Sequence, residues 1–359
     1  MSRFLSSKYE DLEPYTPGEQ PKNMKKLIKL NTNENPYDPA PEVLLAINNE
    51  EIEKLRLYSD PEAAPLIEAA AGFYGVGRDM VMAGNGSDEV LAFLFMAFQQ
   101  KSGRFYFPEI SYSFYPVYCN HLGLTYETVP LKDDFSINLR DYRRKNGGIV
   151  LANPNAPTGI ALTRREIAFI VKNNPDHVII VDEAYVRFGG ETAIPLVRKY
   201  PNILVVQTMS KSHSLAGLRV GFAIGSPELI EGMYRVKDSF NSYPVDRIAQ
   251  AGAIASLQNK RTVEANINTV RATREGVSVA LRMIGFDVLP SSANFIMIHY
   301  WNCKARDLFD HLRSKNILVR HFDQPRIEDY LRVTIGTKEE MRIFLDVVEE
   351  YVDGKGRFD

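Results

Sequence analysis

One lysine and one arginine enclose a short segment that is rich in small and hydroxylated residues. Lys211 follows the apolar run 203–206, and Arg219 comes eight positions later, after Ser-His-Ser-Leu-Ala-Gly-Leu. An amine that forms a Schiff base needs a fixed backbone, little surrounding bulk and nearby donors for an anion. This segment supplies all three, although most lysines in any chain are simply solvated. Its place after a predicted strand favours a ligand site, because ligands of open α/β sheets bind at the carboxyl edge.

A second apolar run ends in an aspartate. Asp182 follows the β-branched run 178–181. A carboxylate at this place often serves only as a turn or helix cap. Its functional role would be to face the pyridine nitrogen of pyridoxal phosphate and keep it protonated, so that the ring accepts electrons from the substrate's α-carbon. Tyr185 could then reach the phenolic oxygen of the ring. Lysine, arginine and aspartate are the three charges that a pyridoxal phosphate site requires.

A glycine turn between a short strand and an apolar helix could hold a phosphate. Gly-Asn-Gly-Ser-Asp occupies 84–88, directly before the predicted helix 90–98. Backbone N–H groups at a helix start, together with the positive end of its dipole, attract an anion. Further side-chain donors would come from Thr208, Ser210 and Arg219. Glu89 occupies the third glycine position of the dinucleotide fingerprint, which argues against a nicotinamide-dependent oxidoreductase.

Other chemical signals are weaker. Tyr112 follows a predicted strand and either packs in the core or stacks on a cofactor ring. The six histidines show no metal-ligand spacing that other ligands support, so no metal is predicted. No nucleophile elbow and no phosphate-binding P-loop is present in the sequence.

Composition narrows the class of protein. With 45% hydrophobic and 25% charged residues, the chain has the composition of an ordinary globular protein. A net charge of −2 provides no electrostatic basis for binding nucleic acid or an anionic membrane. Only two cysteines in 359 residues, and an N-terminus without an apolar signal segment, indicate a reduced, cytoplasmic protein. No apolar stretch is long enough to span a bilayer.

Strands and helices alternate through the middle of the chain. The expected strands are 80–83, 104–107, 125–129, 149–152, 178–181, 203–208 and 220–224. The expected helices are 41–57, 66–74, 90–98, 114–122 and 164–173. Such alternation is typical of parallel strands joined by crossover helices. It predicts an α/β domain whose mainly parallel sheet is covered on both faces.

The end of the chain has a different pattern, and the length of the chain suggests two domains. A long helical region, 247–283, bends near its middle and is followed by a mixture of short elements. These are expected as strands 294–299, 317–319 and 331–335 and helices 305–315 and 338–351. We therefore predict a large α/β domain over 38–255 and a smaller α+β domain over 256–359. The proline- and asparagine-rich residues 1–37 are expected to form an arm that joins the small domain.

Three motifs carry a resemblance to a known family. The stretches Asn-Pro-Asn-Ala-Pro-Thr-Gly at 153–159, Asp-Glu-Ala-Tyr at 182–185 and 210–219 resemble motifs of fold-type I pyridoxal phosphate enzymes. More narrowly, the chain resembles the histidinol-phosphate aminotransferases of the class II aminotransferase family. The match runs in order from 13–18 through 33–36 to 331–336. It implies a fold-type I transferase with a mainly parallel seven-stranded sheet and pyridoxal 5'-phosphate as cofactor.

The resemblance also assigns roles to matching residues. Lys211 would form the Schiff base, Asp182 would pair with the pyridine nitrogen, and Tyr185 would contact the ring oxygen. The other cofactor contacts would come from Gly86, Ser87, Asp88, Tyr112, Thr208, Ser210 and Arg219. Substrate contacts would come from Tyr15, Asn33, Arg320 and Arg332. Tyr58 would reach the phosphate from a second subunit, which implies a homodimer with shared active sites.

One departure from the family pattern matters for the cofactor. The family usually has asparagine directly before Pro-Thr-Gly, where its amide contacts the phenolic oxygen of the ring, and this chain has Ala156 there. Either Asn155 supplies the amide from one residue earlier, or Tyr185 carries more of the contact. We favour Asn155.

The implied reaction is transamination of L-histidinol phosphate with 2-oxoglutarate in histidine biosynthesis, giving imidazole acetol phosphate and glutamate. Lys211 would move the proton as general acid and base. An aromatic amino-acid aminotransferase or a threonine-phosphate decarboxylase would keep the same cofactor residues. Arg320 favours a substrate with an anionic end, but an arginine binds a carboxylate as well as a phosphate. A binding or regulatory protein is disfavoured, because Lys211 and Asp182 are both present.

Overall fold

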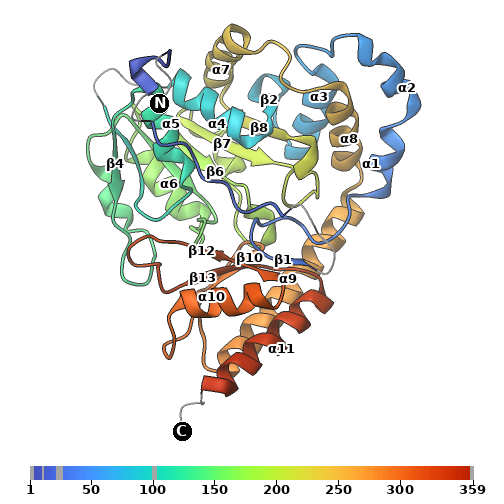
Figure 1. The fold of residues 1–359 in the computed structure, drawn as a ribbon. Helices are drawn as coiled ribbons and strands as arrows, with labels where there is room; N and C mark the ends of the chain where they lie inside the picture. Colours follow the sequence, from blue (N-terminus) through green and yellow to red (C-terminus); the bar gives the residue numbers. More distant parts are fainter. Residues whose placement is uncertain (1–3, 10–11, 22–26, 99–102, 356–359) are drawn as a thin grey trace.

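The computed structural model describes residues 4–9, 12–21, 27–98 and 103–355, and it contains a large sheet and a second, smaller sheet region (Figure 1). Within these residues the large sheet has seven strands in the order β2-β8-β7-β6-β5-β3-β4. They are β2 (Val81–Asn85), β3 (Phe105–Pro108), β4 (Tyr126–Val129), β5 (Gly148–Ala152), β6 (Ile179–Asp182), β7 (Ile203–Thr208) and β8 (Val220–Gly225). The pairs from β4 to β7 are parallel, and β8 is antiparallel to both β7 and β2. The predicted α/β fold with a mainly parallel seven-stranded sheet is confirmed.

Both faces of the large sheet are buried, which explains why its strands are almost continuously apolar. Alternate residues of β6 point to opposite faces: Ile179 and Val181 belong to one packing cluster, and Ile180 belongs to another. The first cluster includes side chains of α3 (Ala64–Tyr74), α6 (Arg164–Lys172) and α8 (Arg247–Gln258). The second includes side chains of α4 (Gly86–Ala97), α5 (Phe114–Leu122) and α7 (Pro227–Phe240).

Short polar signals mark where several of these helices begin. Thr163 and Glu166 form a capping box at the start of α6, in which each side chain satisfies a backbone N–H of the other residue. Ser226 caps α7 and Asp246 caps α8 in the same general way. Among the described residues, no helix combines the length and the apolar character that crossing a membrane requires.

The second sheet region lies below the large sheet in Figure 1 and packs on three helices. Its four-stranded sheet has the order β12-β13-β10-β9. The strands are β9 (Asp287–Val288), β10 (Phe295–His299), β12 (Arg320–His321) and β13 (Leu331–Thr334), and the helices are α9 (Lys260–Met283), α10 (Ala305–Ser314) and α11 (Lys338–Lys355). The N-terminal strand β1 (Ile28–Lys29) pairs in parallel with β11 (Ile317–Leu318). This pairing brings the N-terminal segment beside the C-terminal part of the chain.

We propose that the chain divides as predicted, at about residues 37 and 255. Ala249 and Ala253 of α8 pack in the cluster of the large sheet, whereas Val263 and Ile267 of α9 pack with the second sheet. The two helices meet at Asn259, which ends α8. The bend expected within 247–283 lies at this residue.

Several details differ from the sequence-based expectation. Helix α7 was not predicted. Residues 41–57 are not one helix but α1 (Pro41–Ala46), α2 (Asn49–Glu53) and a 3-10 turn at Lys54–Arg56. The break occurs because the Asn48 side chain accepts a hydrogen bond from the backbone N–H of Glu51 and starts a new helix. The short strands β1, β9 and β12 were also not predicted, because two residues are too few to show a periodicity.

Candidate active site

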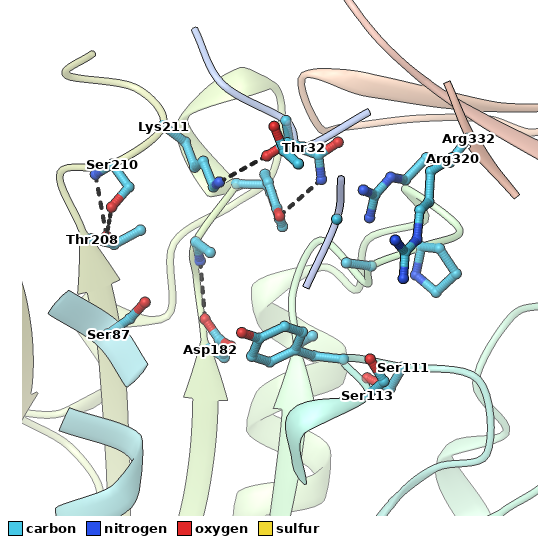
Figure 2. A pocket seen from close by; sticks show the side chains of 18 of the residues that line it. Thr32, Ser87, Ser111, Ser113, Asp182, Thr208, Ser210, Lys211, Arg320 and Arg332 are labelled. Carbon is cyan, nitrogen blue, oxygen red and sulfur yellow. Dashed lines mark hydrogen bonds between the residues drawn. The ribbon is translucent and has the colours of Figure 1, made fainter. Parts of the chain in front are cut away.

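One pocket lies at the carboxyl ends of the parallel strands, facing the second sheet. Its walls come from the ends of β5, β6 and β7, the start of α4, the loop after β3, residues 31–33 and strands β12 and β13. The predicted site residues that line it are Tyr15, Asn33, Ser87, Asp88, Tyr112, Asp182, Tyr185, Thr208, Ser210, Lys211, Arg219, Arg320 and Arg332. Figure 2 shows Ser87, Thr208 and Ser210 on one side and both arginines on the other. Lys211 and Asp182 lie between these two groups.

Lys211 follows β7, and both its amine and its backbone are held by the N-terminal segment. Its Nζ donates to the Thr32 carbonyl at 3.2 Å (Figure 2), and the Asn35 amide donates to the Lys211 carbonyl at 3.0 Å. Burial, and then the positive charge of Arg332, lowers the pKa of the Lys211 amine to about 8. Part of the Lys211 population is therefore a neutral amine near neutral pH, as proton transfer requires.

Asp182 is the last residue of β6, and its carboxylate is buried. Tyr115 Oη donates to Oδ2 at 2.9 Å, and the backbone N–H of Ala184 donates to Oδ1 at 3.2 Å. Burial raises the pKa of Asp182 to about 6, and these two hydrogen bonds partly oppose the rise. A cation bound against this carboxylate would favour its ionised form.

The hydroxyl end of the pocket, which we define as Ser87, Asp88, Thr208, Ser210 and Arg219, surrounds the start of α4. Thr208 Oγ1 donates to Ser210 Oγ at 3.0 Å, and Arg219 Nη1 lies 3.5 Å from the same Ser210 oxygen. The side chain of Asp88 links Arg219 Nη2 (2.8 Å) to Tyr112 Oη (3.0 Å). The expected role of Asp88 was a backbone donor, and the structure adds this bridge.

Gly86 does not itself line the pocket, but it shapes the hydroxyl end. Its φ is +79°, and an added Cβ would lie 2.5 Å from Nη2 of Arg219. Only glycine therefore allows the arginine to cross the first turn of α4. The backbone N–H groups of this first turn have no carbonyl partners within the helix.

The arginine end of the pocket, which we define as Tyr15, Arg320, Phe322 and Arg332, belongs mostly to the second sheet. Arg320 and Arg332 are register partners on β12 and β13. The guanidinium of Arg332 lies 5.3 Å from the ring centroid of Phe295 and 5.5 Å from that of Phe322, and the guanidinium of Arg320 lies 5.6 Å from that of Phe322. Burial lowers the pKa of Arg332, and its buried Nε has no hydrogen-bond partner in the part of the chain that is described.

Tyr185 joins the middle of the pocket to the N-terminal segment. Its hydroxyl accepts a hydrogen bond from the Asn33 amide at 2.9 Å, and its ring stands edge-on to Phe295 at 5.0 Å. Burial raises the pKa values of Tyr185 and Tyr112, so both hydroxyls remain protonated at neutral pH. Asn33 is itself fixed by Thr334, whose Oγ1 donates to Asn33 Oδ1 at 3.1 Å.

Besides Gly86, two predicted residues lie outside this pocket, Asn155 and Tyr58. The Asn155 amide is buried and donates to the Ile110 carbonyl at 2.9 Å and to Thr158 Oγ1 at 3.0 Å, while Oδ1 accepts from Ser111. Ala156, not Asn155, is in the pocket wall, so Asn155 fixes the adjoining loop and does not face the pocket. Tyr58 is 82% exposed and stacks on Tyr243.

The structure also places in the site residues that sequence reasoning missed. Thr32 and Asn35 hold Lys211, Tyr115 holds Asp182, and Phe322 supports both arginines. Asn35 belongs to the same 33–36 motif as Asn33, so that motif was the only available signal for it. Nothing local marks Tyr115 or Phe322 as different from core aromatic residues.

Comparison with known proteins defines the class of this molecule. Residues 25–348 match the family described as aminotransferase class I and II, and the chain belongs to this family. A crystal structure of histidinol-phosphate aminotransferase from Sinorhizobium meliloti, in complex with pyridoxal-5'-phosphate, has the same fold with a TM-score of 0.87. It is 23% identical, and the alignment covers 98% of this chain and 100% of that one.

Two more similar relatives carry a more particular name. The histidinol-phosphate aminotransferase of Gluconacetobacter diazotrophicus is 52% identical, over 97% of this chain and 98% of its own length. Histidinol-phosphate aminotransferase 1 of Methylococcus capsulatus is 50% identical, over 99% of both chains.

Proposed function

We propose that this protein is a pyridoxal phosphate-dependent aminotransferase that transfers the amino group of L-histidinol phosphate to 2-oxoglutarate in histidine biosynthesis. About half of all residues are identical to those of histidinol-phosphate aminotransferases over nearly the whole chain, and this identity carries the proposal. The pocket supports the proposal, because Lys211 lies between a set of hydrogen-bond donors that suit a phosphate and a pair of arginines.

The residues of the hydroxyl end fit the phosphate of pyridoxal phosphate. Ser87, Thr208, Ser210 and Arg219 offer hydroxyl and guanidinium donors, and the first turn of α4 offers backbone N–H groups. The absence of a side chain at Gly86 leaves room for this arrangement. When bound, the cofactor attaches to the substrate amine and withdraws the electrons released at its α-carbon. Asp182 would hold the pyridine nitrogen, with Tyr112 against the ring.

Lys211 would move the proton at the substrate's α-carbon. Its lowered pKa of about 8 provides a neutral amine that accepts this proton and an ammonium that returns it. The Thr32 carbonyl, 3.2 Å from Nζ, orients the amine, and the Asn35 amide fixes the lysine backbone. Tyr185 and Asn33 would contact the ring oxygen and the substrate from the same side.

The arginine end would hold the anionic groups of both substrates. Arg332, whose Nε is buried and unpaired among the described residues, would bind the carboxylate of 2-oxoglutarate or glutamate. Arg320 and Tyr15 would bind the phosphate of L-histidinol phosphate. An arginine stacked on an aromatic ring keeps its donors in one plane, which suits both groups.

We also propose a homodimer with shared active sites. Large apolar side chains are exposed on α1, α2 and the segments that follow or contact them, namely Leu44, Leu45, Ile52, Leu55, Leu57 and Tyr243. A second copy of the chain would cover this surface. Tyr58, 82% exposed at its edge, would then reach the hydroxyl end of the partner's pocket. A cytoplasmic location is part of the proposal, because Cys119 and Cys303 are not joined in a disulfide.

The test is amino transfer to 2-oxoglutarate, with L-histidinol phosphate, phenylalanine and tyrosine compared under the same conditions. We expect a strong preference for L-histidinol phosphate. A preference for the aromatic amino acids would leave the cofactor chemistry in place and overturn the proposed substrate. Release of carbon dioxide from threonine phosphate, without amino transfer, would overturn the reaction type.

A further inference from the structure

An arginine outside the pocket connects the second sheet region to the large sheet. Arg326 lies in the loop between β12 and β13, four residues after Phe322. Its Nη2 donates to the Lys132 carbonyl at 2.7 Å, and its Nη1 donates to the Leu131 carbonyl at 3.1 Å. Nη1 also donates to the Glu109 carboxylate. All three acceptors belong to loops that follow strands of the large sheet, so the planar guanidinium joins the two regions.

The backbone on both sides of this contact adopts an uncommon conformation. Arg326 has φ +72° and Phe135 has φ +60°, both in the left-handed region. The guanidinium of Arg326 lies over the ring of Phe135, 5.3 Å from its centroid. Non-glycine residues adopt this conformation only where their surroundings hold them in it. The contact between the two loops supplies that support.

Further contacts surround the arginine. The Gln324 amide donates to the backbone carbonyl of Glu109 at 3.1 Å. Ile327 is fully buried in a cluster with Ile110 and Leu131. Glu109 accepts a second hydrogen bond, from the backbone N–H of Leu131 at 3.0 Å, which orients its carboxylate.

Each of the two joined loops adjoins residues that line the pocket. Glu109 lies three residues before Tyr112, and Arg326 lies six residues after Arg320. We propose that the Glu109–Arg326 bridge is a specificity-determining element. It sets the separation between the Tyr112 wall and the Arg320 wall, and thereby the length of the substrate that reaches both. Arg326 and Glu109 are positioning residues, because neither lines the pocket. The inference rests on the proposed function, in which the far end of the longer substrate is a phosphate.

The test uses the holoenzyme and two separate half-reactions, one with L-histidinol phosphate and one with L-glutamate. The variants are Arg326→Gly, which removes the guanidinium at a backbone position that glycine adopts freely, Glu109→Gln, and the pair together. The control is Arg342→Ala, because Arg342 bonds two carboxylates within the surface of α11 alone. Amide hydrogen exchange over 109–112 and 320–330 is measured in parallel on the same proteins without substrate.

We expect the KM for L-histidinol phosphate to rise roughly 10- to 100-fold in Arg326→Gly, because a displacement of the order of an ångström is this costly to a positioned substrate. The KM for L-glutamate should stay within about twofold of the wild-type value, and so should both KM values of Arg342→Ala. Exchange should become faster in both loops of Arg326→Gly. The double variant should lose no more than Arg326→Gly, because the two side chains act as one unit.

Several results would overturn this proposal. Equal increases in KM for both substrates would show that the bridge only stabilises the fold in general. Amide exchange that becomes faster uniformly through the chain would show the same. An unchanged KM for L-histidinol phosphate in a folded Arg326→Gly protein would also overturn it. If Arg326→Gly does not fold, Glu109→Gln decides the same question by a smaller change in the same direction. Wild-type enzyme that does not prefer L-histidinol phosphate would contradict the proposed function instead, and the exchange measurement would still decide the bridge.

Discussion

The two ends of the pocket balance their charges differently. At the hydroxyl end, Arg219 has a carboxylate partner in Asp88 at 2.8 Å, and Asp88 is bonded in turn to Tyr112. At the arginine end, neither Arg320 nor Arg332 has a carboxylate within ion-pair distance among the residues that the structure describes. Aromatic rings support these two guanidinium groups instead.

This difference matches the two kinds of ligand that we propose. A resident cofactor is held by many fixed donors, and the hydroxyl end supplies these from strand ends and a helix start. Exchanging substrates must be attracted from solution, and uncompensated positive charge does this for anions. The buried and unpaired Nε of Arg332 strengthens the attraction, because an unsatisfied buried donor is costly until an acceptor arrives.

The largest effect should come from Lys211→Ala, which removes the group that both ends share. We expect turnover to fall by at least about a thousandfold and the visible absorbance of the lysine-bound cofactor to disappear. Lys315→Ala is the control, because Lys315 pairs with Glu350 on the surface and should change neither property. Normal absorbance in Lys211→Ala would contradict the assignment of the reactive amine.

Arg320→Ala should affect the arginine end alone. We expect kcat/KM for L-histidinol phosphate to fall by a factor that corresponds to about 2–5 kcal/mol of lost transition-state stabilisation. The value for L-glutamate should fall much less, because Arg332 remains. Steady-state kinetics of the two half-reactions measure this difference. Arg306→Ala is a matched control, since Arg306 also stacks on a ring, that of Phe309, but at the surface. Equal losses with both substrates would show that Arg320 does not recognise the phosphate.

Gly86→Ala should affect the hydroxyl end alone. The added Cβ would lie 2.5 Å from Arg219, at a φ that alanine adopts with strain. We expect cofactor affinity to fall by about 1–3 kcal/mol while the ratio of kcat/KM values for the two substrates stays constant. Titration of the cofactor-free protein measures the affinity. Gly276→Ala is the control, because no atom lies within 4 Å of its added Cβ. A changed substrate ratio in Gly86→Ala would show that the two ends are not independent.

The smallest effect should come from Glu34→Gln. Burial and Arg332 lower the pKa of Lys211 to about 8, while the negative charge of Glu34 raises it. Removing that charge destabilises the ammonium, so the pKa of Lys211 should fall by less than about one unit. This pKa is measured in the cofactor-free protein from the rate at which an amine-specific reagent modifies Lys211. The rate rises with pH as the amine loses its proton. A rise in the pKa of Lys211 would contradict this electrostatic role of Glu34. The surface variant Glu68→Gln is the control and should leave the pKa of Lys211 unchanged.

Local signals allowed much of the hydroxyl end to be predicted. Strand β7 begins and ends at the predicted residues. Asp182 ends β6, and Lys211 follows the neighbouring parallel strand β7, as expected. These assignments succeed because β-branched runs and glycine turns express preferences of the residues themselves. That the absence of a side chain at Gly86 makes room for Arg219 was not predicted.

Long-range contacts were less accessible, and most of the arginine end consists of them. At the arginine end, Arg332 Nη2 donates to the Asn31 carbonyl across 301 positions of the chain. In the middle of the pocket, Lys211 bonds Thr32 across 179 positions. The strand β12 that carries Arg320 has two residues and no detectable period. Asn155 shows the same limit, because its amide bonds to Ile110 and Thr158 and so does not face the pocket.

The sequence by itself determined the seven strands of the large sheet, the lysine with its nearby charges, and the resemblance to a family. Those properties depend on residue type and spacing along the chain. Only the tertiary structure decided which buried polar groups pair inside the protein and which, like Arg332 Nε, have no partner among the described residues. The reason is physical: a buried donor bonds to whichever acceptor the packing brings within about 3 Å, and here that acceptor often lies in a distant segment.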